Sequence, residues 1–331
     1  MDTLASLPRP FFVLAPMDDV TDTVFRRIIA GCAAPDLFFT EFVNVDGLQS
    51  PGRPKLLKKL CFTELETPLI AQIWGKNPEN FYKTARELAD GTFARELGLP
   101  EAVNFAGIDI NMGCPDKTIV KNGTCSALIN DRELAEEIIQ ATREGAAGWL
   151  PVSVKTRLGF HIIDLTWHEF LLRQDLAMLT IHGRTRKELS DVPANWEQIG
   201  NIRELRDHLA PQTLIVGNGD VMNRAQGKEL AKQYKLDGVM IGRGVFHDPF
   251  VFAEQSPWEG YTREQRIALF RAHVELFAET WRSGDRPIAP LNKFAKIYIA
   301  GFNGAKELRE ELTTARSTDV LLAALAAALE P

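Results

Sequence analysis

Short apolar runs alternate along the chain with longer stretches in which apolar and polar positions follow a helical period. The apolar runs cover residues 11–17, 37–43, 69–74, 107–112, 152–158, 178–182, 214–218 and 238–242. Amphipathic stretches between them, such as 78–88, 132–143 and 224–234, predict helices. Eight strands that alternate with helices indicate parallel βαβ units and favour a closed (β/α)8 TIM barrel. An open, doubly wound parallel sheet is the alternative.

Nearly every apolar run ends in polar or glycine-rich residues. The endings read APMDD, TEFVN, AQIWG, NMGCP, KTRLG, HGRTR, GNGD and IGRG. In parallel barrels the active site is built at the carboxyl ends of the strands. The pattern therefore predicts one site to which most of the strands contribute.

The last quarter of the chain lacks strand-like runs. Helical patterns cover 262–281, 290–302, 305–315 and 317–330. We predict a catalytic barrel domain over residues 1–249 and a C-terminal helical domain of about four helices over 250–331. Residues 257–261 (PWEGY) are interpreted as a linker, and 91–106 as an insertion on the barrel.

Composition adds a few expectations. The 331 residues are 45% hydrophobic and 25% charged, with a net charge of −6, which argues against a strongly basic nucleic-acid-binding domain. The sequence contains no run of 18 apolar residues, so we expect no transmembrane helix. Its first residues do not have the pattern of a signal peptide. The four cysteines form no CxxC pair, so we expect no metal site, no disulfide framework and a reducing cytoplasmic location. A monomer is the default expectation for the oligomeric state.

Two glycine-rich turns follow the seventh and eighth runs: Asn218-Gly219-Asp220 and Gly242-Arg243-Gly244. These loops form the common phosphate site of barrels, because glycine lets backbone N–H groups approach an anion. Arg243 would add a charge-assisted hydrogen bond. The alternative is a pair of tight turns with Arg243 in a surface ion pair. Together the two turns favour a phosphate-bearing cofactor.

Other strand ends carry side chains suited to a flavin ring. Lys155 and His182 end the fifth and sixth runs, and a lysine near the ring would stabilise the anionic reduced flavin. Arg157 shares the face of Lys155, because strand side chains repeat every second residue. Gln72 offers both a donor and an acceptor. His182 in a structural hydrogen bond and Met17 in plain packing are the alternatives.

Cys114 lies between glycine and proline in NMGCP, where a rigid turn would fix its position. A free thiol has a pKa near 8.5, so it is mostly protonated at neutral pH and can act as a general acid. The alternative, a small buried hydrophobe, is preferred for Cys32 and Cys61. Cys125 is interpreted as structural, with a resolving or regulatory thiol left open.

The ordered motifs APM, TE, QIWG, NMGCP, VKTRLG, HGRT, GNGD and IGRG, with the tail sequence NKFAKIYIAGFNGAKELR, resemble those of the tRNA-dihydrouridine synthases from about residue 12 to 309. The resemblance implies an enzyme that reduces uridine in the tRNA D-loop, with FMN as cofactor, NADPH as reductant and tRNA as partner. Hydride would pass from FMN N5 to uracil C6, and Cys114 would donate a proton to C5. Asn111 and Arg157 would contact the uracil. FMN would be held by Ala15, Pro16, Met17, Gln72, Lys155, His182, Asn218, Gly219, Asp220, Gly242 and Arg243.

One segment departs from the family pattern. Thr124-Cys125-Ser126 stands where a smaller, glycine-rich sequence is expected. Two other functions stay open: an FMN barrel that reduces a small enone or free pyrimidine, and a non-enzymatic RNA-binding factor. The helical tail argues against the first, and the presence of Cys114 argues against the second.

Overall fold

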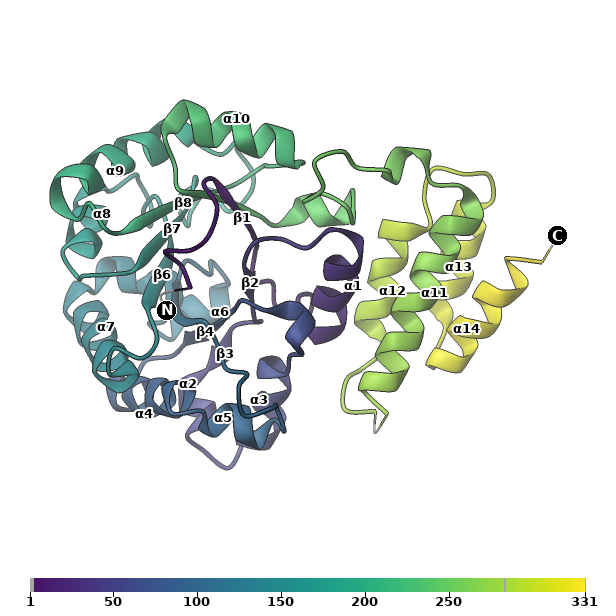
Figure 1. Ribbon diagram of the computed structural model, residues 1–331, viewed down its shortest axis with the longest axis horizontal. Helices are drawn as coiled ribbons and strands as arrows, with labels where there is room; N and C mark the ends of the chain where they lie inside the picture. Colours follow the sequence, from purple (N-terminus) through teal and green to yellow (C-terminus); the bar gives the residue numbers. More distant parts are fainter. Residues whose placement is uncertain (1–2, 283, 331) are drawn as a thin grey trace.

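A parallel barrel forms the larger part of the computed structural model, which describes residues 3–282 and 284–330 (Figure 1). Hydrogen-bonded neighbours follow the order β1-β9-β8-β7-β6-β5-β4-β2, and every pairing is parallel. A parallel bridge between Val13 and Leu37 joins β1 to the start of β2. This bridge closes the sheet, so the predicted TIM barrel is confirmed and the open sheet is wrong. The strands are β1 (Phe11–Leu14), β2 (Phe38–Phe39), β3 (Val43–Asn44), β4 (Leu69–Trp74), β5 (Gly107–Met112), β6 (Val152–Arg157), β7 (Met178–His182), β8 (Leu214–Asn218) and β9 (Gly238–Ile241).

The second predicted strand is interrupted. Its two pieces, β2 and β3, both pair with β4. Between them the Thr40 hydroxyl accepts a hydrogen bond from the Gln72 N–H (3.0 Å) and donates to the Glu41 carbonyl (2.7 Å). A side chain thus replaces one backbone partner in the ladder, and the strand breaks there.

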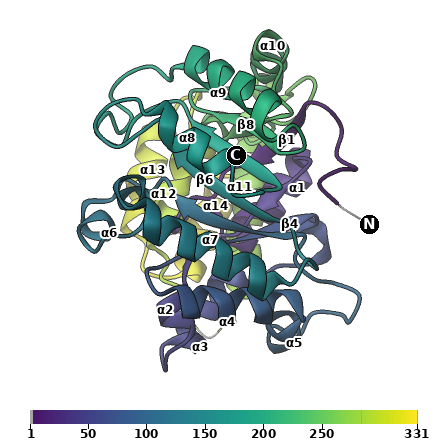
Figure 2. The ribbon, with the colours of Figure 1, turned by 90° about the vertical axis from the view of Figure 1, so that its left-hand side faces the viewer.

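Helices surround the barrel, which Figure 2 shows from the side away from the C-terminal helices. Most of the long ones begin after an Asp or Asn whose side chain accepts a backbone N–H of the first turn, which satisfies a donor that the helix leaves unpaired. These caps are Asp22, Asn77, Asp131, Asp164, Asn195 and Asn223. The helices are α1 (Thr23–Ala33), α2 (Val45–Leu48), α3 (Arg53–Leu57), α4 (Pro78–Ala89), α5 (Thr92–Glu96), α6 (Lys117–Lys121), α7 (Arg132–Ala146), α8 (Leu165–Leu172), α9 (Trp196–Leu209) and α10 (Arg224–Tyr234). Short 3-10 turns are η1 (Lys58–Leu60), η2 (Glu64–Glu66), η3 (Cys125–Asn130), η4 (Arg243–Phe246) and η5 (Trp258–Gly260).

Apolar side chains fill the barrel interior near the amino ends of the strands. Phe11, Val13, Ile70, Met178 and Val216 belong to one buried cluster there, whereas alternate residues of the same strands pack outward against the helices. Because this end of the interior is filled, space for a ligand is left at the opposite end.

Four helices follow the barrel and lie beside it: α11 (Arg263–Thr280), α12 (Ala289–Tyr298), α13 (Ala305–Thr314) and α14 (Thr318–Ala327) (Figure 1). They pack on α1, where the rings of Phe25 and Phe294 lie 5.0 Å apart. The segment 257–261, predicted as a linker, lies between the barrel and α11 but is packed in place. Trp258 is buried and its ring lies 5.2 Å from that of Tyr261 and 6.4 Å from that of Tyr298, so aromatic packing fixes this segment. No described helix combines the length and apolar character needed to cross a membrane.

Candidate active site

A cavity of about 470 Å³ opens at the carboxyl ends of the strands. Its size falls within the range of about 300–1,000 Å³ that is typical of small-molecule and cofactor sites. Every residue that the sequence placed in the site lines this cavity, so the structure brings all of them together. They are Ala15, Pro16, Met17, Gln72, Asn111, Cys114, Lys155, Arg157, His182, Asn218, Gly219, Asp220, Gly242 and Arg243.

The loop that carries Cys114 is fixed by side chains from two strands. The Asn111 Oδ1 accepts hydrogen bonds from the backbone N–H groups of Gly113 (3.0 Å) and Cys114 (2.9 Å). The Arg157 Nε donates to the Gly113 carbonyl at 2.8 Å. A Cβ on Gly113 would lie 3.3 Å from the Lys155 carbonyl oxygen, which is tighter than ordinary contact. Glycine therefore lets the loop pack directly on β6.

Cys114 is a more acidic thiol than its sequence alone indicates. A hydrogen bond from the Cys125 thiol is the largest of several effects that lower the pKa of Cys114 to about 7. Burial, the same hydrogen bond and the nearby Cys114 raise the pKa of Cys125 well above its ordinary value. At pH 7 about half of the Cys114 thiol is therefore ionised. A pKa of about 7 makes Cys114 a stronger acid than a free thiol, whose pKa is near 8.5.

Lys155 faces the cavity without a hydrogen-bond or ion-pair partner among the residues that the structure describes. Burial lowers the pKa of Lys155 to about 8, while Asp109 acts in the opposite direction. A cationic group that is enclosed in this way needs an anionic partner to offset its lost hydration. The cavity therefore favours a ligand with negative charge or carbonyl oxygen near Lys155.

His182 lines the cavity as a neutral imidazole. Burial, and then the charges of Arg157, Lys155, Arg184 and Arg243, hold the pKa of His182 well below its ordinary value. Its Nε2 lies 3.1 Å from Nη1 of Arg184. Because a guanidinium only donates, Nε2 accepts this hydrogen bond and the ring proton resides on Nδ1. His182 thus keeps one N–H donor.

The two glycine-rich turns lie at one side of the cavity. Gly219 has a φ of 135°, and a Cβ there would lie 2.6 Å from the Ala194 Cβ. The Asp220 carboxylate pairs with both Arg184 and Arg243, and these contacts lower the pKa of Asp220. Arg243 therefore forms the ion pair that was the alternative to its contact with a phosphate. Two guanidinium groups for one carboxylate still leave net positive charge for an anion.

Part of the hydrogen-bonding capacity of Asn218 is already used within the protein, because its Nδ2 donates to the Met240 carbonyl at 2.9 Å. The cavity also includes residues that sequence reasoning missed. They are Phe42, Ser190, Val221, Met222, Met240 and His247, whereas Gly113, Pro115 and Gly244, which also line the cavity, belong to the predicted motifs. Phe42 and Met222 follow strands in apolar surroundings, and only their position after a strand end could have indicated them.

The residues present fit a flavin mononucleotide. An unpartnered Lys155, the Gln72 amide and a neutral His182 suit the polar edge of the ring, and the glycine turns with Arg243 suit a phosphate. The half-buried Lys155 amine, which faces the cavity without a partner among the described residues, supports this fit most strongly.

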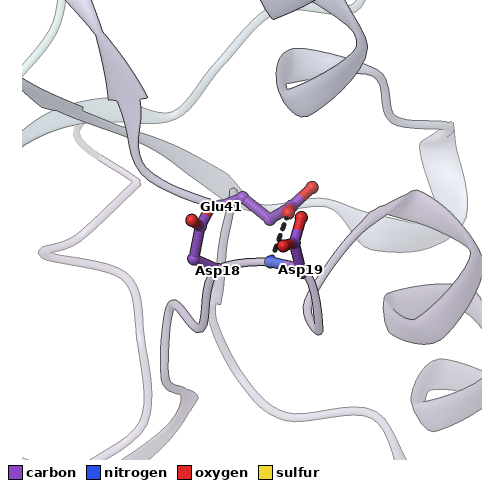
Figure 3. A group of neighbouring side chains, drawn as sticks. All are labelled: Asp18, Asp19 and Glu41. Atoms are coloured by element: carbon purple, nitrogen blue, oxygen red, sulfur yellow. Dashed lines mark hydrogen bonds between the residues drawn. The ribbon is translucent and has the colours of Figure 1, made fainter. Parts of the chain in front are cut away.

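A second polar cluster lies outside the cavity lining. The carboxylates of Asp18, Asp19 and Glu41 come close together, and Glu41 accepts a hydrogen bond from the Asp19 N–H at 2.8 Å (Figure 3). Asp18 pairs with Lys59, and the buried Glu41 pairs with Arg286 of the helical region. The cluster thus links the break between β2 and β3 to the tail.

A closed parallel barrel with a thiol, an amine and two glycine-rich turns around one cavity at the strand ends has the arrangement of a barrel enzyme. The chain belongs to the dihydrouridine synthase family, whose model matches residues 13–330. It is 48% identical over 323 residues to the probable tRNA-dihydrouridine synthase 2 of Bacillus subtilis (strain 168), covering 96% of this chain and 94% of the relative. It is 47% identical over 316 residues to a probable tRNA-dihydrouridine synthase of Staphylococcus aureus (strain COL), covering 95% and 91%.

Solved structures with low sequence identity share the fold. Histamine dehydrogenase from Rhizobium sp. 4-9 superposes with a TM-score of 0.53 at 12% identity, over 83% of this chain and 51% of that one. Morphinone reductase gives 0.51 at 13% identity, over 75% and 86%. These likenesses support the barrel architecture alone.

Proposed function

We propose that this protein reduces uridine in tRNA to 5,6-dihydrouridine, with FMN as cofactor and NADPH as reductant. The observation that carries the proposal is one cavity at the strand ends that combines the acidic Cys114 thiol, the unpartnered Lys155 and the Arg243 turn. Membership of the dihydrouridine synthase family and the names of its relatives support the substrate.

The cofactor would be held along the cavity wall. Bound FMN, once reduced by NADPH, would supply the hydride that uracil accepts at C6. The ring would contact Ala15, Pro16, Met17, Gln72, Lys155 and His182. The phosphate would contact Asn218, Gly219, Asp220, Gly242 and Arg243, with Asp220 acting by its backbone and by holding Arg243 in place.

This chain's side chains would then complete the reduction. Cys114 donates a proton to C5 of the uracil, and a pKa of about 7 places this group near the optimum for general acid catalysis at neutral pH. Arg157 and Asn111 contact the base. Arg157 is fixed by carbonyl groups of Gly113, Thr185 and Leu189, so its charge is in place before negative charge develops on the uracil oxygen.

The four-helix tail, residues 250–331, is proposed to hold the tRNA. A uridine must leave its stack to enter a cavity at the strand ends, at a cost of a few kcal/mol, which a flexible D-loop keeps low. The tail packs rigidly on α1 and on Glu41 through Phe294 and Arg286. It can therefore present the RNA in a fixed orientation.

Mass spectrometry of tRNA tests this function. tRNA from cells that lack the protein should miss dihydrouridine at one or more positions, and expression of the wild-type chain should restore it. Unchanged dihydrouridine content would contradict the proposal. Reduction of free uracil, with no reaction on tRNA, would instead favour the small-molecule alternative.

A further inference from the structure

A chain of hydrogen bonds runs beneath the cavity from β6 to the Cys114 loop. The Ser153 hydroxyl donates to Asp109 Oδ1 (2.6 Å), and the Gln72 Nε2 donates to Asp109 Oδ2 (2.8 Å). The Asn111 Nδ2 in turn donates to the Gln72 Oε1 (3.2 Å). These side chains lie on the neighbouring strands β4, β5 and β6, where Gln72, Asp109 and Ser153 are in register. All of them are buried.

The direction of this chain is fixed at both ends. At one end the Asn111 Oδ1 accepts from two backbone N–H groups, which can only donate, so the Asn111 Nδ2 must face Gln72. At the other end burial raises the pKa of Asp109 to about 6, so at pH 7 and above its carboxylate is mostly ionised and can only accept. The Gln72 Nε2 must then face Asp109. Both ends therefore require the same orientation of the Gln72 amide.

Asp109 does not itself line the cavity, whereas Gln72 and Asn111 do. We propose that Asp109 is a positioning residue that, together with Asn111, sets the direction of the Gln72 amide and so decides which hydrogen-bonding groups face a bound ring. The part of this inference that concerns the ring rests on the proposed flavin site. The direction of the chain does not.

The geometry leaves a defined set of groups for a ligand. The Gln72 Nε2 and the Asn111 Nδ2 each keep one N–H, and the Gln72 Oε1 keeps one lone pair. A pyrimidine edge offers carbonyl oxygens on either side of an N–H, which this set matches. A reversed Gln72 amide would exchange the positions of its donor and acceptor. Like groups of the amide and of the same pyrimidine edge would then face each other.

Four variants separate the direction of the hydrogen-bond chain from the charge of Asp109 and from simple side-chain packing. Asp109→Asn removes the negative charge but keeps the direction of the Gln72 amide. The new amide at position 109 can donate to the Ser153 hydroxyl, because this hydroxyl can turn and donate to the Ile108 carbonyl at 3.4 Å instead. Asn111→Asp keeps the acceptor for the Cys114 loop but sets an acceptor against the Gln72 Oε1. The double variant Asp109→Asn/Asn111→Asp satisfies every group again with the Gln72 amide reversed. Ser153→Ala is the matched control, since it removes a hydrogen bond to Asp109 without touching Gln72.

The thermal unfolding midpoint reports the direction of the chain. Asn111→Asp should lower this midpoint by at least about 4 °C. The double variant should recover most of that loss, and Asp109→Asn and Ser153→Ala should each have small effects. A double variant no more stable than Asn111→Asp would overturn the proposal. This readout needs no flavin, so it stands even if the proposed function fails.

Flavin affinity reports the consequence for the ring. Titration with FMN, followed by its fluorescence, should show affinity within about threefold of wild type for Asp109→Asn and Ser153→Ala, and a loss of at least about tenfold for the double variant despite its recovered stability. Wild-type affinity in the double variant would overturn the role of Asp109 in presenting Gln72. Absence of FMN binding by the wild-type protein would instead contradict the proposed function.

Discussion

The acidity of Cys114 makes a direct prediction about Cys125. The hydrogen bond from the Cys125 thiol is the largest of several effects that hold the pKa of Cys114 near 7 against burial, which acts in the other direction. Cys125→Ala removes this donor and should raise the pKa of Cys114. Cys125→Ser keeps a donor and should leave it low. Both variants carry a Cβ, so the left-handed φ of 53° strains them equally.

The expected magnitude follows from the ionised fractions. With a pKa of about 7, half of Cys114 is thiolate at pH 7, whereas the ordinary value near 8.5 would leave about three parts in a hundred. We expect Cys125→Ala to recover at least about one pKa unit of this difference, which is about 1.4 kcal/mol of lost thiolate stabilisation. The thiolate fraction at pH 7 would then fall several-fold.

The assay is the rate of alkylation by iodoacetamide as a function of pH, read by mass spectrometry of the peptide that contains Cys114. The midpoint of this profile is compared, because intrinsic nucleophilicity also changes with pKa. The other thiols react more slowly at neutral pH, since burial raises the pKa of Cys32 to about 12 and also raises that of Cys61. An unchanged midpoint in Cys125→Ala, or an equal shift in Cys125→Ser, would refute the reasoning.

Three further predictions address the cofactor, the tail and acid stability. Arg243→Ala removes one of two guanidinium groups beside Asp220 and should weaken FMN binding about tenfold in equilibrium dialysis; unchanged flavin content would exclude a phosphate role. Arg286→Met leaves the Glu41 carboxylate buried without its partner and should lower the free energy of unfolding by about 3–5 kcal/mol. Urea denaturation measures this loss, and a loss below about 1 kcal/mol would contradict the role of the buried ion pair. Burial lowers the pKa of His273 to about 3, so below its ordinary value of 6.5 the unfolded chain binds a proton that the folded chain does not. Stability should therefore fall by up to about 1.4 kcal/mol per pH unit between pH 6 and 4, and His273→Phe should flatten this slope, with an identical slope counting against the assignment.

The barrel and its cavity followed from the sequence because strand period and strand endings are local patterns. The endings of β4, β5 and β8, for example, were predicted with their observed bounds, and parallel closure brings such ends together whatever the intervening helices contain. Fourteen residues could be placed at one site without knowing any distance between them.

Contacts between distant segments could not be predicted in this way. Asp109 lies between Ile108 and Ile110 in an apolar strand, and nothing local shows that its partners are Gln72 and Ser153. The Cys125 thiol reaches Cys114 only because the chain turns through a left-handed residue. The segment 257–261 has the proline and glycine of a linker, yet its aromatic rings are buried in tertiary packing that composition does not reveal.

The central claim is tested most directly by a single turnover. The purified protein, loaded with FMN and reduced by NADPH without oxygen, is mixed with an unmodified tRNA transcript, and the return of oxidised flavin absorbance is followed. Wild type should regain this absorbance as dihydrouridine forms in the tRNA, and Cys114→Ala should be slower by at least about a hundredfold. Dihydrouridine formation at the wild-type rate by Cys114→Ala would contradict the account.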